Sequence, residues 1–111
     1  MELTTEQLKR CDLVKVAGRI DSQTAPQLAE ALNTITEAGR FKVVFDMSDL
    51  DFISSAGLRV LIDVQKTCKR WTRGRLVLAA VPERIYETLD LTGFVPLFNI
   101  FDDVLYAVGS F

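Results

Sequence analysis

Histidine is absent from the 111 residues of this chain. It is the side chain that titrates nearest to neutral pH and the commonest metal ligand, so its absence argues against most acid–base mechanisms and most transition-metal sites. Cysteine is scarce: Cys11 and Cys68 lie far apart without a Cys-x-x-Cys partner, which predicts neither a zinc site nor a disulfide framework. Each lies in an apolar pattern, so we expect both to be small buried hydrophobic residues.

An excess of positive charge is also missing. Thirteen Lys and Arg residues stand against fifteen Asp and Glu, for a net charge of −2, whereas a nucleic-acid-binding domain is normally basic. One cationic cluster occurs, but Asp63 lies just before it and no aromatic ladder accompanies it. We interpret it as the solvated face and C-terminal end of a helix (Lys66, Lys69, Arg70, Arg73 and Arg75). Nucleic acid is therefore not an expected partner.

Long hydrophobic runs are lacking as well. No apolar stretch approaches the roughly 20 residues of a membrane-spanning helix. The first residues, MELTTEQLKR, lack the apolar core of a signal peptide. We therefore expect a cytoplasmic protein without membrane insertion.

The composition that is present is typical of a soluble globular protein, with 49% hydrophobic and 25% charged residues. The length suits one hydrophobic core, so residues 1–111 are expected to form a single domain. Strand-like and helical patterns alternate along the chain. Strands are expected at 3–9, 11–17, 41–46, 76–80 and within 94–101, and helices after Pro26, Ser55, Pro82 and Asp102. This order predicts an α/β fold with a mixed, mostly parallel central sheet of about four to five strands packed with about four helices.

Local signals set the boundaries of these elements. Gly18 is expected to end the second strand, and Thr24 with Gln27 forms a candidate capping box. Asp102 is expected to cap the last helix. The helix after Ser55 carries two apolar stripes, which predict a wide surface lying on the sheet (Leu58, Leu61, Ile62 and Gln65; Val60, Val64, Cys68 and Trp71).

The most informative stretch runs from Val43 to Leu61, VVFDMSDLDFISSAGLRVL. A strand-like run gives way to an acidic turn, and Ser54 and Ser55 then stand where a loop becomes a helix. First-turn N–H groups of a helix lack intrahelical partners, and a serine oxygen can accept from one of them. A helix start also tolerates an anion, so a phosphate on one hydroxyl is locally favourable. The pattern predicts either a structural cap or a regulatory serine.

Two catalytic interpretations of this stretch are disfavoured. Asp46, Asp49 and Asp51 resemble magnesium ligands, but no phosphate-binding glycine loop is present and aspartates are common in turns. A nucleophilic Ser55 would need a base, and the chain has neither a Gly-x-Ser-x-Gly motif nor a histidine. A small hydrolase is therefore the less favoured function, and we expect no enzyme activity, no cofactor and no metal.

The run Asp51–Leu61 resembles the signature of the STAS domain, the family of bacterial anti-sigma-factor antagonists. Two further segments agree in order and spacing: Gly18–Ala25 resembles the segment after the family's second strand, and Leu89–Phe94 resembles its Leu-x-x-[Ser/Thr]-Gly-[Leu/Phe] pattern. Together with the central strand, the resemblance covers nearly the whole chain. The usual motif has an aspartate where Ser54 stands here.

The resemblance implies a partner switch. The serine two positions before Gly57-Leu58, which is Ser55, would be the phosphorylation site, with Ser54 as the alternative acceptor. The unphosphorylated protein would bind an anti-sigma factor that is also a serine kinase, phosphorylation would block binding, and a PP2C-type phosphatase would reset the switch. The implied contact surface comprises the helix start, its flanking residues and the preceding loop (Asp21, Ser22, Thr24, Ser54, Ser55, Ala56, Gly57, Leu58, Arg59 and Asp63). The alternative is a soluble STAS subunit of a transport or stressosome-type signalling assembly.

Overall fold

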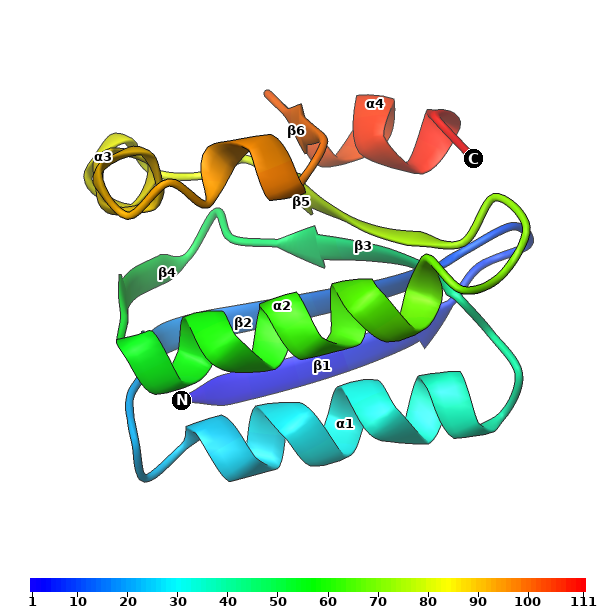
Figure 1. The fold of residues 1–111 in the computed structure, drawn as a ribbon, viewed down its shortest axis with the longest axis horizontal. Helices are drawn as coiled ribbons and strands as arrows, with labels where there is room; N and C mark the ends of the chain where they lie inside the picture. The colour runs from blue at the N-terminus through cyan, green and yellow to red at the C-terminus, as the bar shows by residue number, and fades with distance from the viewer.

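A computed structural model describes all 111 residues (Figure 1). The elements follow in the order β1 (Glu2–Gln7), β2 (Asp12–Ile20), α1 (Ala25–Glu37), β3 (Lys42–Asp46), β4 (Leu50–Ile53), α2 (Ser55–Cys68), β5 (Arg75–Ala79), α3 (Glu83–Leu91), the 3-10 helix η1 (Val95–Leu97), β6 (Ile100–Phe101) and α4 (Val104–Gly109). The predicted α/β class is confirmed.

The strands form one mixed sheet in the order β1-β2-β3-β5-β6. The first pair, β1 and β2, is antiparallel, and all other pairs are parallel. The sheet is therefore mostly parallel, as predicted. The additional strand β4 pairs with β2 beyond the end of β3 and lies off this path.

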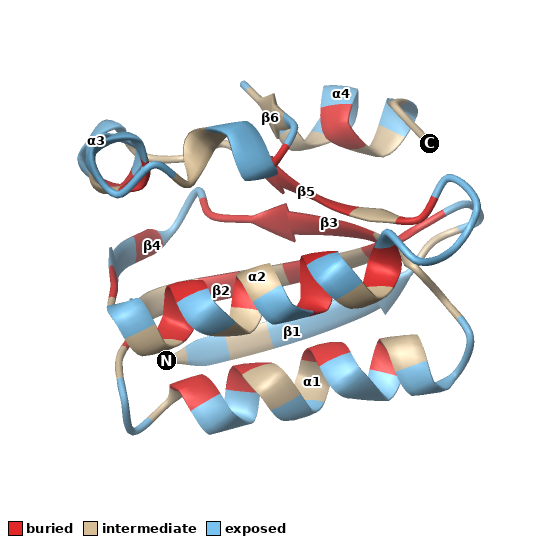
Figure 2. Cartoon of the chain, viewed as in Figure 1, coloured by how far each residue is buried: buried red, intermediate tan, exposed pale blue.

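The two central strands are buried on both faces. Val43 and Phe45 belong to the main hydrophobic cluster with α1, α2 and α3, whereas Val44 and Val77 belong to a smaller cluster with α4. Figure 1 shows α1 and α2 side by side on one side of the sheet, with α4 on the other side next to β5, and Figure 2 shows the buried strands between them. This arrangement explains the nearly continuous apolar character of β3 and β5.

Both cysteines are free and buried, as predicted. Burial raises the pKa of the Cys68 thiol to about 11. Burial, and then the neighbouring Asp12 carboxylate, raise the pKa of Cys11. Both thiols are therefore protonated at neutral pH and act as small hydrophobic side chains.

The prediction that β2 ends at Gly18 is wrong. Gly18 has a φ of +92°, which glycine adopts readily, and β2 continues through it to Ile20. Strand β2 changes its neighbour from β3 to β4 between Lys15 and Gly18, and the register of its pairing with β4 shifts between Gly18 and Arg19. The strand β4 itself was not expected, because its stretch was interpreted as an acidic turn.

Three other local predictions also fail. Thr24 makes no capping hydrogen bond to the start of α1, so the capping box is absent. The last helix is capped by Asp103 and not by Asp102, since the Asp103 carboxylate accepts from the Tyr106 N–H at 2.8 Å. Trp71 lies beyond the end of α2 and is 54% exposed, stacked on Phe41 instead of on the sheet.

The chain between β3 and α2 determines where the two serines lie. After β3 comes a short connecting segment, in which the buried Met47 donates its N–H to Ala79 O at 3.0 Å. It then returns as β4 alongside the last residues of β2, with Ile53 opposite Ile20. No helix of the protein has the length and apolar character needed to cross a bilayer.

Candidate functional site

Ser54 and Ser55 have different roles at the start of α2. Ser54 is the N-cap, with φ −83° and ψ 172°, and its Oγ accepts from the Gly57 N–H at 3.3 Å. Ser55 is the first helical residue and is exposed, and its hydroxyl makes no hydrogen bond in the structure. The first helical bond runs from Leu58 N–H to Ser54 O at 3.0 Å. The N–H groups of Ser55 and Ala56 precede that bond and remain available to an anion.

Backbone pairing and close packing fix this helix start against β2. The Ser54 N–H donates to Ile20 O at 2.8 Å. Gly57 lies so close to the sheet that a Cβ atom there would be 2.6 Å from Ile20 Cγ2 and 2.8 Å from Ile53 Cγ1. A glycine at this position therefore permits the approach of α2 to the strands that carry the site.

We expect Gly57→Ala to lower the free energy of unfolding by about 1–3 kcal/mol, because overpacking of a filled core forces neighbouring side chains to move. Urea unfolding measures the change. Gly109→Ala is the matched control, since nothing lies within 4 Å of a Cβ atom at that helical glycine. Equal stabilities of the two variants would contradict the close approach.

The loop that follows β2 is ordered by its own hydrogen bonds. The Asp21 N–H donates to Thr24 Oγ1 at 2.9 Å, and Asp21 Oδ1 accepts from the N–H groups of Gln23 and Thr24 at 2.9 and 3.1 Å. The backbone donors, Thr24 first and then Gln23, lower the pKa of Asp21, so this carboxylate stays ionised at neutral pH. Because Asp21 directly follows Ile20, its loop begins beside the start of α2.

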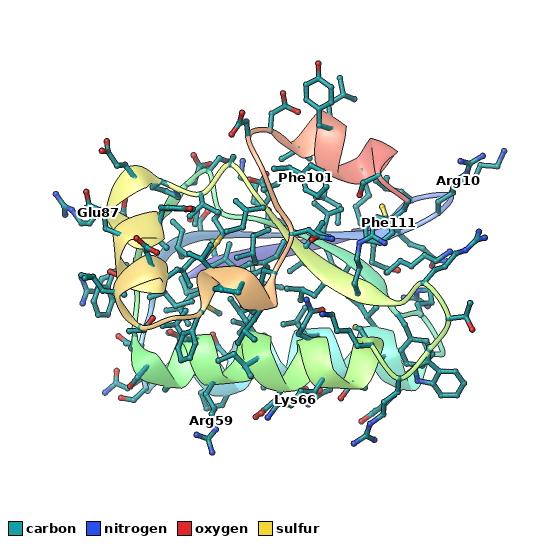
Figure 3. All side chains as sticks on the ribbon, turned by 45° about the horizontal axis from the view of Figure 1, so that its top comes forward. Arg10, Arg59, Lys66, Glu87, Phe101 and Phe111 are labelled. Atoms are coloured by element: carbon teal, nitrogen blue, oxygen red, sulfur yellow. The ribbon has the colours of Figure 1, made fainter.

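The predicted contact residues divide into an exposed and a buried group. Ser55, Arg59 and Asp63 are exposed and spaced four residues apart, so they share one face of α2. Figure 3 shows Arg59 and Lys66 projecting away from this helix. Gly57 and Leu58 are buried, Leu58 being only 4% exposed, so they support the site from within. In the neighbouring loop Ser22 is exposed, whereas Asp21 and Thr24 are half-buried. At the helix start, Ser54 and Ala56 are also half-buried.

The pair Arg19 and Phe52 also flanks the site and was missed by the sequence analysis. The Arg19 guanidinium lies 4.4 Å from the centre of the Phe52 ring. The two residues are opposite each other in the β2–β4 ladder, and both are exposed. Only the pairing of β4 with β2 brings them together, and no sequence signal predicted that pairing.

The aspartates considered as metal ligands are engaged locally. Asp46 accepts from the Ser48 N–H at 2.9 Å, and Asp49 forms an ion pair with Lys15 at 3.0 Å. Asp51 is exposed on β4. No group of three or more His, Cys, Asp or Glu side chains in the chain is arranged to hold a metal ion.

The family model of the STAS domain matches residues 2–107. The chain belongs to the STAS domain family. Over 111 residues this STAS domain is 32% identical to BtrV of Bordetella bronchiseptica, which carries the provisional name of anti-sigma factor antagonist. That match covers 100% of this chain and 95% of BtrV.

Solved STAS structures share the fold. The crystal structure of an anti-sigma factor antagonist from Mycobacterium paratuberculosis superposes with a TM-score of 0.87 at 24% identity, covering 98% of this chain and 92% of that one. The structure of the Bacillus cell fate determinant SpoIIAA in its phosphorylated form has a TM-score of 0.78 at 15% identity and covers 98% of each chain. The helix start that carries Ser55 therefore lies in a common STAS framework.

Proposed function

We propose that this STAS domain is an anti-sigma-factor antagonist in a partner switch controlled by phosphorylation of Ser55. The division of roles between the two serines carries the proposal: Ser54 Oγ is engaged as the helix cap, whereas the Ser55 hydroxyl is exposed and free of hydrogen bonds. A kinase can therefore reach the Ser55 hydroxyl without breaking the helix cap that Ser54 forms. The names of BtrV and of the Mycobacterium paratuberculosis protein support the same function.

The proposed partner is an anti-sigma factor that is also a serine kinase. It binds the unphosphorylated protein over the exposed face of α2 that carries Ser55, Arg59 and Asp63, and over the Asp21–Thr24 loop. This binding releases the sigma factor. Phosphorylation of Ser55 by the same partner ends the interaction, and a PP2C-type phosphatase restores it.

Electrostatics explain why the phosphate would block binding. It adds a charge of about −1.5 to −2 at neutral pH, which a docked partner would have to desolvate. The ionised Asp21 carries negative charge beside the same helix start. The free N–H groups of Ser55 and Ala56 can hold the phosphate locally. The fold then stays unchanged, and the effect is confined to the docking surface.

We expect incubation with the cognate kinase and ATP to add one phosphate to the wild-type protein and to Ser54→Ala, but none to Ser55→Ala. Intact-protein mass spectrometry measures the transfer. Unfolding curves of both variants provide the control, because loss of the Ser54 cap costs about 0.5–2 kcal/mol without removing the acceptor. A phosphate lost only in Ser54→Ala would overturn the assignment.

A further inference from the structure

A second candidate site lies at the end of the molecule opposite Ser55. Three loops meet there, at the amino ends of the parallel strands: the turn from β1 to β2, the connection from α1 to β3, and the connection from α2 to β5. Cationic residues from all three loops gather at this end (Lys9, Arg10, Arg40, Lys42, Lys69, Arg70 and Arg73). Figure 3 shows Arg10 and Glu87 at opposite ends of the molecule. This end of the molecule is therefore basic, although the net charge of the chain is −2.

A cavity of about 790 Å³ lies between these loops. Its size is within the range of small-molecule sites. Only 4 of its 15 lining residues are hydrophobic, which does not suit an acyl chain. Its charged lining comprises four cations and two acids (Lys9, Arg10, Arg40 and Lys42; Asp12 and Glu37).

Arg40 is held in this cavity by a buried carboxylate. The Arg40 Nε lies 3.0 Å from Asp12 Oδ1 and 3.2 Å from Asp12 Oδ2, and the Asp12 side chain is only 4% exposed. The two Nη groups of Arg40 make no hydrogen bond, and its side chain is 36% exposed. A guanidinium has five N–H donors in a rigid fork, so four donors remain to bind an anion. Asp12 fixes the direction of that fork.

The remaining cations of the lining strengthen the positive potential of the cavity. Lys9, Arg10 and Lys42 form no ion pair in the structure, whose salt bridges are Lys15–Asp49 and Arg40–Asp12. Their charges are therefore not neutralised by an internal partner. An anion in the cavity would meet them without displacing a carboxylate.

An aromatic wall completes the cavity. The ring of Trp71 stacks on Phe41, with centroids 4.6 Å apart and planes inclined by 10°. One side of the indole is thus covered, yet Trp71 remains 54% exposed. The turn that carries it is closed by the Gly74 N–H donating to Trp71 O at 2.9 Å and holds Arg73 at a φ of 60°. A non-glycine residue in this region is strained, and such strain often occurs at ligand-binding loops.

We propose that this cavity binds a small anion that carries a planar ring, such as an aromatic phosphate or carboxylate. The anionic group binds the free Nη donors of Arg40, and the ring stacks on the exposed part of Trp71. The site is separate from the Ser55 switch and does not depend on the proposed function.

Trp71 is the only tryptophan of the chain, so its fluorescence reports binding directly. We expect phenyl phosphate to bind the full-length protein about fivefold more tightly than inorganic phosphate or phenol, because only phenyl phosphate supplies both the charge and the ring. Calorimetry on the same protein gives the affinities independently of the fluorophore.

Two cavity variants and two controls test the assignment. Arg40→Gln and Trp71→Leu should each weaken phenyl phosphate binding about fivefold, and Trp71→Leu should abolish its advantage over inorganic phosphate. Lys66→Gln removes an exposed cation outside the cavity, and Ser55→Asp alters only the switch, so both should bind like the wild type. Should Arg40→Gln fail to fold, Lys42→Gln tests the charge requirement. The proposal is overturned if phenyl phosphate shows no binding or no preference over inorganic phosphate, or if Lys66→Gln weakens binding as much as the cavity variants.

Discussion

Ser55→Asp is expected to lower the affinity for the kinase-type anti-sigma factor by about tenfold or more, whereas Ser55→Ala binds like the wild type. Ser55 is exposed at the first position of α2, on the same face as Arg59 and Asp63. A carboxylate at this position must be desolvated when a partner docks, and it adds to the negative charge that the ionised Asp21 already places beside the helix start. A tenfold change corresponds to about 1.4 kcal/mol, well within the cost of an unpaired charge at an interface.

Titration calorimetry with the purified partner measures this effect. Thr72→Asp is the matched control, because it adds the same charge to an exposed position in the connection that follows the opposite end of α2, and it should leave the affinity unchanged. The loss caused by Ser55→Asp should also shrink as ionic strength rises, since salt screens exposed charges. Equal affinities of Ser55→Asp and Ser55→Ala would remove the electrostatic explanation.

Gln65→Leu is expected to lower the free energy of unfolding by about 2–3 kcal/mol. Gln65 is 5% exposed and bridges three elements: its Oε1 accepts from the Leu76 N–H at 2.7 Å, and its Nε2 donates to Leu97 O at 2.9 Å. A leucine would leave both backbone groups without a partner, and each buried unpaired group costs about 1–3 kcal/mol. Leu97 is 41% exposed, so water can compensate part of the loss at its carbonyl.

The position of Gln65 explains why the amide is needed. On the outer edge of β5, Leu78 donates its N–H to Asn99 O and Ala80 to Phe101 O, both at 3.0 Å. The edge strand β6 is too short to reach Leu76. The Gln65 side chain therefore replaces a third residue of that strand.

Urea unfolding of Gln65→Leu provides the measurement. The exposed Gln27 on α1 offers a matched control, because Gln27→Leu removes no side-chain hydrogen bond and should change stability by less than about 0.5 kcal/mol. A Gln65→Leu variant as stable as the wild type would mean that the bridge contributes nothing to folding.

The sequence predicted the larger elements because their signals are periodic and long. Strand β3 follows a nearly continuous apolar run, and its burial on both faces is confirmed. The start of α2 at Ser54 and Ser55 follows from serine preceding a helical apolar stripe. Gly39 and Gly93 lie just after the ends of α1 and α3 at positive φ values of 85° and 78°, which is typical of a glycine that follows a helix.

The features that were missed depend on tertiary contacts. The strand β4 has only four residues, of which Leu50 and Ile53 are buried and the two between them are exposed, so it shows no alternation. Thr24 was assigned to a capping box from its spacing to Gln27, but Asp21 competes for its hydroxyl and its N–H. Gln65 fitted an apolar stripe by position, and only the unpaired edge of β5 explains why that position is polar.

The exposure of Trp71 could not be predicted from the helical apolar pattern of the sequence either. It continues a helical stripe in the sequence, but α2 ends at Cys68 and the chain turns sharply to Gly74. A Cβ atom at Gly74 would overlap the carbonyl oxygen of Cys68, so the turn is tight. The stripe therefore ends one turn earlier than its pattern suggests, and the indole is left at the surface.

The exchange of neighbours along β2, from β3 to β4 between Lys15 and Gly18, also affects how a partner would associate. Ile20 holds the start of α2 through its carbonyl and leads directly into the Asp21 loop, so both parts of the proposed docking face are attached to one strand end. The face is preorganised, and binding requires no ordering of a flexible segment, which spares the entropy cost of such ordering. We expect encounters with the proposed partner to be limited by diffusion and orientation, without a slow conformational step.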